Sequence, residues 1–385
     1  MHAEPVGSAE YRGSHRGLLR PIPRFSASRP AHPLDAIVVP TSRSLKRQLP
    51  GLELAVGLAQ QMECSLFVLC SGNAHEQDFP EGIRKRLGAR LEAWQVEHED
   101  RAALPLLSSS RNRLSRLYRS SDLGLKRNLA LALASASGWS RLLFIDDDIT
   151  PDSSGETLDG DRLKDALQAM HADIALRAVG WPVSQFPDNS VVGHTRRLVN
   201  QEQKTFVGGG ALLVRCDNDV PFFPDIFNED WLFLIATAMA SPDYRRSIGI
   251  AGSVGQLSYN PYRVIRAKAE EAGDIIGEGL MNLLEDDGPA CMAQGKDPSY
   301  WSEAKQARAT LIRELDAAVS SVESSVCQKV LTTLSAARGV HDLITPQDIS
   351  GYVNDWLGDL PEWRDHVAGL ATDLLARRHE PAPTG

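Results

Sequence analysis

Three consecutive aspartates, Asp146, Asp147 and Asp148, are the side chains of this sequence best suited to binding a cation. They directly follow the apolar run 141–145, whose composition is typical of a strand buried on both faces of a parallel sheet. Ligands of open α/β sheets bind at the carboxyl ends of strands, and adjacent carboxylates repel unless they share a cation. In an extended chain, Asp146 and Asp148 face one way and Asp147 the other. The triplet predicts a Mg²⁺ or Mn²⁺ site that also receives substrate phosphates, with a solvated acidic turn as the alternative.

A second acidic pair, Glu229 and Asp230, opens the predicted helix 229–240. A carboxylate beside an acceptor hydroxyl can take its proton, and Asp230 is the first candidate for this role and Glu229 the second. The alternative is structural, because Asn228 suits an N-cap and acids in a first turn interact favourably with the helix dipole. The two roles are compatible.

The predicted strand 206–214 contains Gly208, Gly209 and Gly210. Glycine weakens a strand interior by roughly 0.5–1 kcal/mol relative to alanine, so its use here needs a reason. Close approach of a sugar to the backbone and a β-bulge are equally good reasons. Trp231 can stack on a sugar ring, although single aromatic residues more often belong to the core.

The hydrophobic pattern indicates the elements that must position these residues. The apolar runs 35–40 and 65–70 enclose the helical pattern 45–62, which is a βαβ unit with parallel strands. Further strands are predicted at 141–145, 172–179, 206–214 and 247–251, and helices at 84–96, 125–136 and 229–240. The fold class is therefore α/β, with a mainly parallel sheet flanked by helices.

From residue 263 onward the apolar spacing is helical, at 263–276, 301–334, 346–357 and 361–375. The first residues are rich in Arg, Ser, Gly and Pro and lack apolar periodicity. The predicted organisation is a flexible leader at 1–33, an α/β domain at 34–262 and a C-terminal helical region at 263–385.

Composition excludes several classes of protein. The 385 residues are 42% hydrophobic and 24% charged, as in folded globular proteins. The formal net charge of −9 gives no general attraction to nucleic acid, and the five dispersed cysteines lack the spacing of a zinc site. The longest apolar run, 231–240, is about half of the roughly 20 residues that span a bilayer. We expect a cytoplasmic protein with no nucleic-acid partner and no integral membrane segment.

The segment 142–148 resembles the D-x-D segment of nucleotide-sugar-dependent glycosyltransferases with the GT-A fold. Three further segments resemble that family and occur in its order, from about residue 35 to 262. They are the basic-Asn helix start 124–128, the glycine-containing strand 208–215 and the Glu-Asp motif 228–231. The resemblance implies a GT-A-like, Rossmann-type sheet followed by a C-terminal helical appendage.

The resemblance also implies roles for individual residues. In the family the last aspartate of D-x-D holds the metal and the first lies toward the ribose, which assigns the metal to Asp148, with Asp146 beside it. The implied donor-binding residues are Pro40, Thr41, Ser42, Arg43, Lys126, Arg127, Asn128, Asp146 and Asp147. The implied acceptor-binding residues are Gly208, Gly209, Gly210 and Trp231. The family's third metal ligand, commonly a histidine, leaves His341, His366 and His379 as candidates, or no protein ligand at all.

The resemblance implies a hexosyltransferase-type enzyme that moves a sugar from a nucleotide-sugar donor to a hydroxyl of a small-molecule or glycan acceptor and depends on Mg²⁺ or Mn²⁺. We expect inversion at the anomeric centre, and retention is the alternative because the fold alone does not decide between them. A nucleotidyltransferase is one alternative, but it needs a glycine-rich phosphate loop after the first strand, and residues 40–44 do not form one. The other alternative is a non-catalytic protein that binds sugar nucleotides. The presence of both acidic motifs argues against it.

Overall fold

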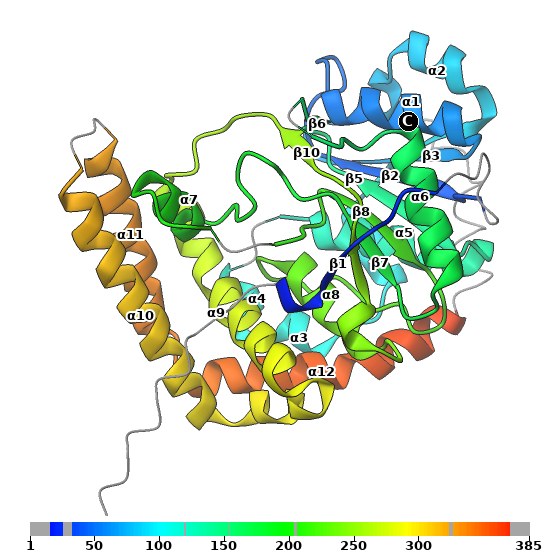
Figure 1. The fold of residues 1–385 in the computed structure, drawn as a ribbon. Coiled ribbons are helices and arrows are strands. Elements are labelled where there is room, and N and C mark those ends of the chain that lie inside the picture. The colour runs from blue at the N-terminus through cyan, green and yellow to red at the C-terminus, as the bar shows by residue number, and fades with distance from the viewer. Residues whose placement is uncertain are drawn as a thin grey trace, which may run out of the picture.

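The structure, a computed structural model, describes residues 16–25, 33–118, 121–153, 155–203, 206–322 and 326–369. A sheet of eight strands forms its centre (Figure 1). In spatial order these are β1 (Leu19–Pro21), β9 (Ile248–Ile250), β7 (Ala178–Gly180), β8 (Ala211–Arg215), β5 (Arg141–Ile145), β2 (Ala36–Thr41), β3 (Ser65–Cys70) and β4 (Leu91–Gln95). β8 is antiparallel to β5 and β7, and the other pairs are parallel. The predicted mainly parallel sheet is confirmed.

Helices cover both faces of this sheet, because alternate residues of each buried strand point to opposite sides. Leu143 and Ile145 of β5 pack with α1 (Pro50–Met62), α2 (Glu81–Leu87) and α6 (Gly160–Ala172). Leu142 and Phe144 pack in the core that includes α5 (Leu123–Ser137) and α8 (Glu229–Met239). The short helices are α3 (Ser108–Arg111), α4 (Arg113–Tyr118) and α7 (Val191–Leu198).

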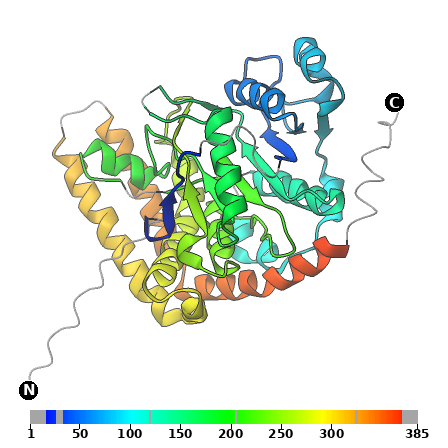
Figure 2. The ribbon, with the colours of Figure 1, turned by 45° about the vertical axis from the view of Figure 1, so that its right-hand side comes forward.

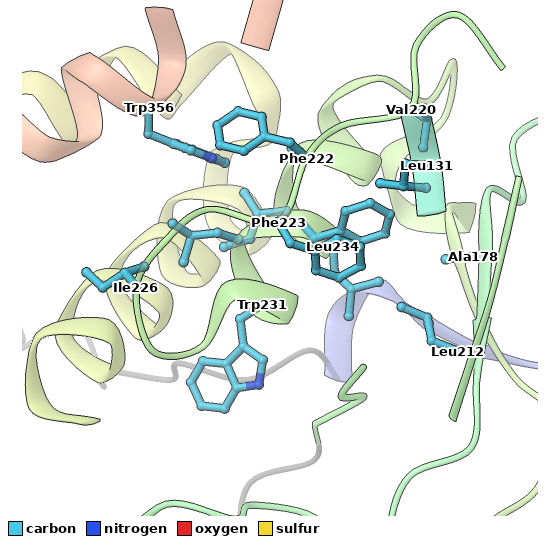
Figure 3. Close-up of a cluster of buried hydrophobic side chains, with 14 of the residues drawn as sticks. Leu131, Ala178, Leu212, Val220, Phe222, Phe223, Ile226, Trp231, Leu234 and Trp356 are labelled. Atoms are coloured by element: carbon cyan, nitrogen blue, oxygen red, sulfur yellow. The ribbon is translucent and has the colours of Figure 1, made fainter. Parts of the chain in front are cut away.

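The C-terminal helices are α9 (Val264–Asp287), α10 (Pro298–Ser320), α11 (Cys327–Leu343) and α12 (Pro346–Gly369). α10 and α11 lie side by side, and α9 lies between them and α8 (Figure 1). α12 continues through Pro361 and runs beneath the α/β region in both views (Figures 1 and 2). In Figure 3 Trp356 of α12 lies beside Phe222, within the same buried cluster as Trp231. The helical appendage therefore shares a hydrophobic core with the sheet.

The N-terminal segment differs from the predicted flexible leader. Residues 16–18 form a short 3₁₀ helix, and β1 pairs with β9 in parallel. Leu18 and Ile22 are buried, with 0% and 5% of their surface exposed. A leader through residue 33 is therefore wrong for residues 16–25, because a three-residue edge strand is too short to produce a periodic signal. Residues 1–15 and 26–32 lie outside the described part of the chain.

Two predicted elements have different boundaries or a different type. The predicted helix 84–96 divides into α2 and the strand β4, because Gly88 at φ 57° ends the helix in a conformation that favours glycine. The predicted strand 206–214 is shorter, since β8 begins only at Ala211. The three glycines therefore precede the strand instead of interrupting it.

A small antiparallel ribbon extends the carboxyl edge of the sheet. β6 (Ile149–Pro151) pairs with β10 (Val254–Gln256), and this register sets Gln256 opposite Ile149. The ribbon brings residue 256 next to the aspartate triplet, which ends at residue 148. Among the described residues, no helix is both long enough and apolar enough to cross a membrane.

The burial of the N-terminal segment leads to a stability prediction. Leu18→Ala is expected to lower the free energy of unfolding by about 2–5 kcal/mol, because it empties a fully buried site beside β9. Arg24→Ala is the control in the same segment, because that side chain is 55% exposed. Urea denaturation measures both. Equal stability of the two variants would mean that residues 16–25 contribute little to the core.

Candidate active site

A cavity of about 660 Å³ lies where the acidic segments and the glycine segment meet. Asp146 reaches it from the end of β5, Gly208 and Gly210 from the loop before β8, and Asp230 from the start of α8. Its other walls come from residues 181–190 and from the first turns of α9. The fold therefore brings together three segments that are separate in the sequence. The further lining of the cavity includes Arg43, Arg127, Glu229, Trp231 and Gln256.

Arg127 of α5 connects the two acidic motifs. Its Nη2 lies 2.9 Å from Asp146 Oδ1 and its Nη1 lies 3.0 Å from Glu229 Oε1. The guanidinium is almost completely buried and lies over the Phe223 ring, 5.2 Å from its centroid. Burial alone would lower the pKa of Arg127, but the carboxylates of Asp146 and Glu229 outweigh it, and the net pKa is raised. Arg127 is thus a fixed positive charge in the floor of the site.

Glu229 and Asp230 are adjacent but have different surroundings. Burial, followed by the charge of Asp230, raises the pKa of Glu229 to about 8 against the opposing effect of Arg127. Asp230 Oδ2 accepts a hydrogen bond from the backbone N–H of Gly209 at 2.7 Å, and its Oδ1 accepts one from the N–H of Trp231 at 2.9 Å. Glu229 is therefore engaged with Arg127, whereas Asp230 is oriented by backbone groups at the cavity wall.

The prediction that the Asn228 side chain caps α8 is wrong. Asn228 has φ 62° and makes no side-chain hydrogen bond to the first turn of α8. Its Nδ2 instead donates to Asp274 Oδ1 of α9 at 2.7 Å. The acids at 229 and 230 still lie in the first turn, where the helix dipole favours them.

Close approach explains the glycine segment. A Cβ at Gly209 would lie 2.4 Å from Arg127 Nη1, so a side chain there would displace the guanidinium. A Cβ at Gly208 would lie 3.1 Å from Asp230 Oδ2. Gly208 and Gly210 line the cavity, and Gly209 lies beneath it as the hydrogen-bond donor to Asp230. The acceptor-binding role of the three glycines stays a prediction.

The aspartate triplet is a turn, so the expected alternation of its side chains is wrong. The N–H of Ile149 donates to Asp146 O at 3.1 Å, which closes the turn before β6. Asp147 and Asp148 both pair with Arg43, at 3.0 Å between Nη2 and Asp148 Oδ2. Only Asp146 of the three turns toward Arg127 and the cavity.

The predicted donor-binding residues fall into separate groups. Lys126 is buried and donates to Thr41 O at 2.9 Å and to Ser71 Oγ at 2.7 Å, so it ties β2 to β3. Asn128 exchanges hydrogen bonds with the backbone of Phe223. Neither residue lines the cavity. Pro40 is buried within β2, and Thr41 Oγ1 donates to Asp147 Oδ2 at 2.5 Å. These residues hold the walls together instead of lining them.

A second cavity, of about 600 Å³, adjoins the first at Arg43. Its lining is mainly basic and polar and comprises Ser42, Arg43, Ser44, Lys46, Arg47, Asn73, His75 and Asp78. It lies beyond the carboxyl ends of β2 and β3, where open α/β sheets bind ligands. Ser42 and Arg43 were predicted from the resemblance, whereas the residues at 73–78 carry no motif.

The donor set limits how a metal can be held. Within the described ranges, no three His, Cys, Asp or Glu side chains are arranged to hold a metal by themselves. His341 and His366 contact the backbone oxygens of Lys305 and Ala103, and His379 lies outside the described residues. Mg²⁺ typically binds one or two carboxylates together with water and substrate phosphates. Asp148, with Asp146 nearby, fits that mode, in which phosphates complete the coordination.

The segment 256–262 is rich in hydrogen-bonding groups, which favours packing between the sheet and the C-terminal helices or, alternatively, a border of the acceptor pocket. Gln256 begins this segment. Its Nε2 donates to Asp148 Oδ2 at 3.2 Å, and the residue lines the main cavity. Arg266 of α9 also lines the cavity, pairs with Glu270 and lies over the Tyr259 ring at 4.8 Å. The pairing of β6 with β10 brings Gln256 to the site, and the docking of α9 brings Arg266, which no local pattern indicates.

No protein-family model and no curated protein matches this chain. Among solved structures, a mannosyltransferase from Pyrobaculum calidifontis in complex with GDP-mannose and Mn²⁺ is 14% identical, with a TM-score of 0.43 over 91% of this chain and 93% of that chain. A glucosyl-3-phosphoglycerate synthase from Mycobacterium tuberculosis, in complex with Mn²⁺, UDP-glucose and phosphoglyceric acid, is 13% identical, with a TM-score of 0.40 over 72% and 86%.

The raised pKa of Glu229 leads to a pH prediction. A carboxyl that holds its proton up to about pH 8 when folded, but releases it near 4.5 when unfolded, stabilises the fold fully only at low pH. Its contribution is lost as the pH rises from about 4.5 to 8. Relative to Glu229→Gln, the wild type is therefore expected to lose stability over this range, as measured by urea denaturation at several pH values.

The control for this prediction is Glu314→Gln, a change at an exposed residue of α10. Its pH profile should parallel that of the wild type. If Glu229→Gln also paralleled the wild type, Glu229 would be ionised throughout and Arg127 would hold two full negative charges.

Proposed function

We propose that this chain is a glycosyltransferase of the hexosyltransferase type, which moves a sugar from a nucleotide-sugar donor to an acceptor hydroxyl with inversion at the anomeric carbon. The observation that carries the proposal is the single cavity in which Asp146, Arg127 and Asp230 meet. A transfer of this kind needs a base beside the acceptor and positive charge beside the leaving group. The carboxylate of Asp230 and the guanidinium of Arg127 line the cavity and suit these two tasks.

The two adjoining cavities suit the two ends of a nucleotide sugar. We assign the nucleoside to the basic cavity at Ser42 and Asn73 and the sugar to the main cavity at Gly208 and Asp230. Arg43 lines both, so the diphosphate between the two ends would pass its guanidinium. In the structure the Arg43 guanidinium pairs with Asp147 and Asp148, and phosphate oxygens would compete with these carboxylates for it.

Mg²⁺ or Mn²⁺ would be held by Asp148, with Asp146 nearby, and would supply charge neutralisation of the departing diphosphate. Arg127 adds a second, permanent positive charge from below the cavity and fixes Asp146 in place. Gln256 keeps Asp148 oriented through its amide. These residues define the donor side of the proposed site.

On the acceptor side, Asp230 would take the proton of the acceptor hydroxyl as its oxygen bonds to the anomeric carbon. The bond between that carbon and the phosphate oxygen breaks, and the electron pair leaves with the nucleoside diphosphate. The Gly209 N–H holds the Asp230 carboxylate at 2.7 Å, so the base is oriented before the acceptor arrives. Glu229 is the weaker candidate because its carboxyl is paired with Arg127.

The solved structures suggest the first probes. UDP-glucose and GDP-mannose are the donors bound in the two similar structures, and phosphoglyceric acid and glycerol 3-phosphate are bound as well in the synthase structures. Wild-type protein with Mn²⁺ and each donor should release UDP or GDP when one of these acceptors is present. A donor that binds only the native state also raises the melting temperature. Binding without release under every condition would favour a non-catalytic sugar-nucleotide binding protein.

Asp230→Asn tests the base. The change keeps the size of the side chain and an acceptor for the Gly209 N–H, but an amide cannot take a proton from a hydroxyl. Turnover at saturating donor and acceptor is expected to fall by about 10²–10⁴-fold, with little change in donor affinity. Quantification of the released nucleoside diphosphate, at a temperature where the variant is folded, gives the rate.

Glu229→Gln is the matched comparison, because it neutralises the neighbouring acid. A rate for Asp230→Asn within a few-fold of the wild type would exclude Asp230 as the base. If Glu229→Gln alone were inactive, the role would pass to Glu229. If neither change mattered, both acids would only support the helix terminus.

A further inference from the structure

Helix α9 of the C-terminal region approaches the segment 227–231 unusually closely. A Cβ at Gly273 would lie 2.0 Å from Phe227 O, and a Cβ at Gly277 would lie 2.7 Å from Trp231 Cε3. Residues four apart lie on the same face of a helix, so Gly273 and Gly277 together form one contact surface, the glycine seat. The carbonyl oxygen of Phe227 and the ring of Trp231, which flank Glu229 and Asp230 in the sequence, pack against it. A side chain at either glycine would displace the segment 227–231.

Asp274 lies between the two glycines and holds the same segment through a hydrogen bond. Its Oδ1 accepts from Asn228 Nδ2 at 2.7 Å, and its Oδ2 accepts from Arg308 Nη2 of α10 at 2.6 Å. Asn228 has φ 62°, a conformation that non-glycine residues rarely adopt. The bond to Asp274 therefore fixes a turn that the backbone alone would not favour.

Arg308 fixes Asp274 in turn. It is fully buried and also pairs with Glu271 at 2.9 Å and with Glu278 at 2.8 Å. Burying charged side chains costs free energy unless their ion pairs and hydrogen bonds are well formed. Replacing buried ion pairs with apolar residues often leaves a fold equally stable. A cluster that only joined α9 to α10 would not need a hydrogen bond to any other segment. Asp274 Oδ1 nevertheless accepts a hydrogen bond from Asn228, the residue before Glu229.

We propose that Arg308, Asp274, Gly273 and Gly277 are positioning residues that hold the segment 227–231 and, through it, the Asp230 carboxylate. The C-terminal helices thereby contribute to the transfer through four residues that lie outside the lining of the cavity. The catalytic consequence rests on the proposed role of Asp230, whereas the positioning itself is a structural property that is measured separately.

A pair of alanine substitutions on α9 tests the proposal. Gly277→Ala adds a methyl group against Trp231, whereas Gly279→Ala adds one against Trp301 of α10, whose Cζ3 would lie 2.4 Å away. Both variants replace a glycine of α9 with alanine, and in both the added methyl group lies against a tryptophan ring. Only the first pushes on the segment that carries Asp230.

Hydrogen exchange is the first readout and needs no substrate. In Gly277→Ala the amides of residues 227–231, and that of Gly209, which donates to Asp230, are expected to exchange at least about tenfold faster than in the wild type. In Gly279→Ala they should exchange as in the wild type, whatever happens to the melting temperature. Equal exchange at these amides in the two variants would overturn the proposal.

Turnover is the second readout. With UDP-glucose or GDP-mannose, Gly277→Ala is expected to lower kcat by about 10- to 100-fold with donor affinity retained, because small displacements of a catalytic group are costly. Gly279→Ala should keep kcat near that of the wild type. Faster exchange without any loss of kcat would support the positioning of the segment but exclude Asp230 as the base. Failure of the positioning proposal is therefore distinguishable from failure of the proposed function.

Asn228→Gly examines the hydrogen bond independently of the glycine seat. Glycine keeps the positive φ but removes the amide that binds Asp274. Asn200→Gly is the control, because Asn200 is an exposed asparagine with φ 57° after α7. Faster exchange at 229–231 is expected for the first variant alone. Exchange at the wild-type rate in Asn228→Gly would exclude Asp274 and Arg308 from the positioning.

Discussion

The guanidinium of Arg127 is the group on which the arrangement of the site depends. A buried cation needs closely paired acidic partners, and here these are the Asp146 carboxylate at the end of β5 and the Glu229 carboxyl group at the start of α8. The requirement fixes the distance between a strand end and a helix start that are 83 positions apart, from 146 to 229. It also requires glycine at 209, because a Cβ there would occupy the position of the guanidinium. The arrangement of the cavity, the acids and the glycine segment depends on one triad, which consists of Arg127, Asp146 and Glu229.

The same principle recurs on either side of the triad. Lys126, the residue before Arg127, is buried and joins the carboxyl ends of β2 and β3, so consecutive residues of α5 hold different parts of the sheet edge. On the far side of α8, Arg308 holds Asp274 against Asn228. The segment 228–230, which carries the proposed base, is thus held by two buried cations, Arg127 through Glu229 and Arg308 through Asp274. Lys126, Asp274 and Arg308 stabilise the walls of the proposed site from outside the lining of the cavity.

The sequence predicted those features that have a local cause. Uninterrupted apolar residues identified β2, β3 and β5, and the Leu and Ala spacing identified α5 with its terminal glycine. The acids at 146, 229 and 230 were expected at one site, and they line one cavity. What sequence reasoning missed arises from contacts between distant segments. The pairing of β1 with β9, the turn that directs Asp147 and Asp148 to Arg43, and the seat on α9 have no signature within their own residues.

The most direct measurement of the central claim is the position of a manganese ion, from anomalous diffraction of crystals that contain Mn²⁺ with UDP or GDP. The account predicts one strong peak within roughly 2 Å of an Asp148 carboxylate oxygen, bridged to the diphosphate, with Arg43 released from Asp148 and Arg127 still between Asp146 and Glu229. A peak elsewhere on the protein, or a nucleotide bound away from both cavities with Arg43 unmoved, would contradict it.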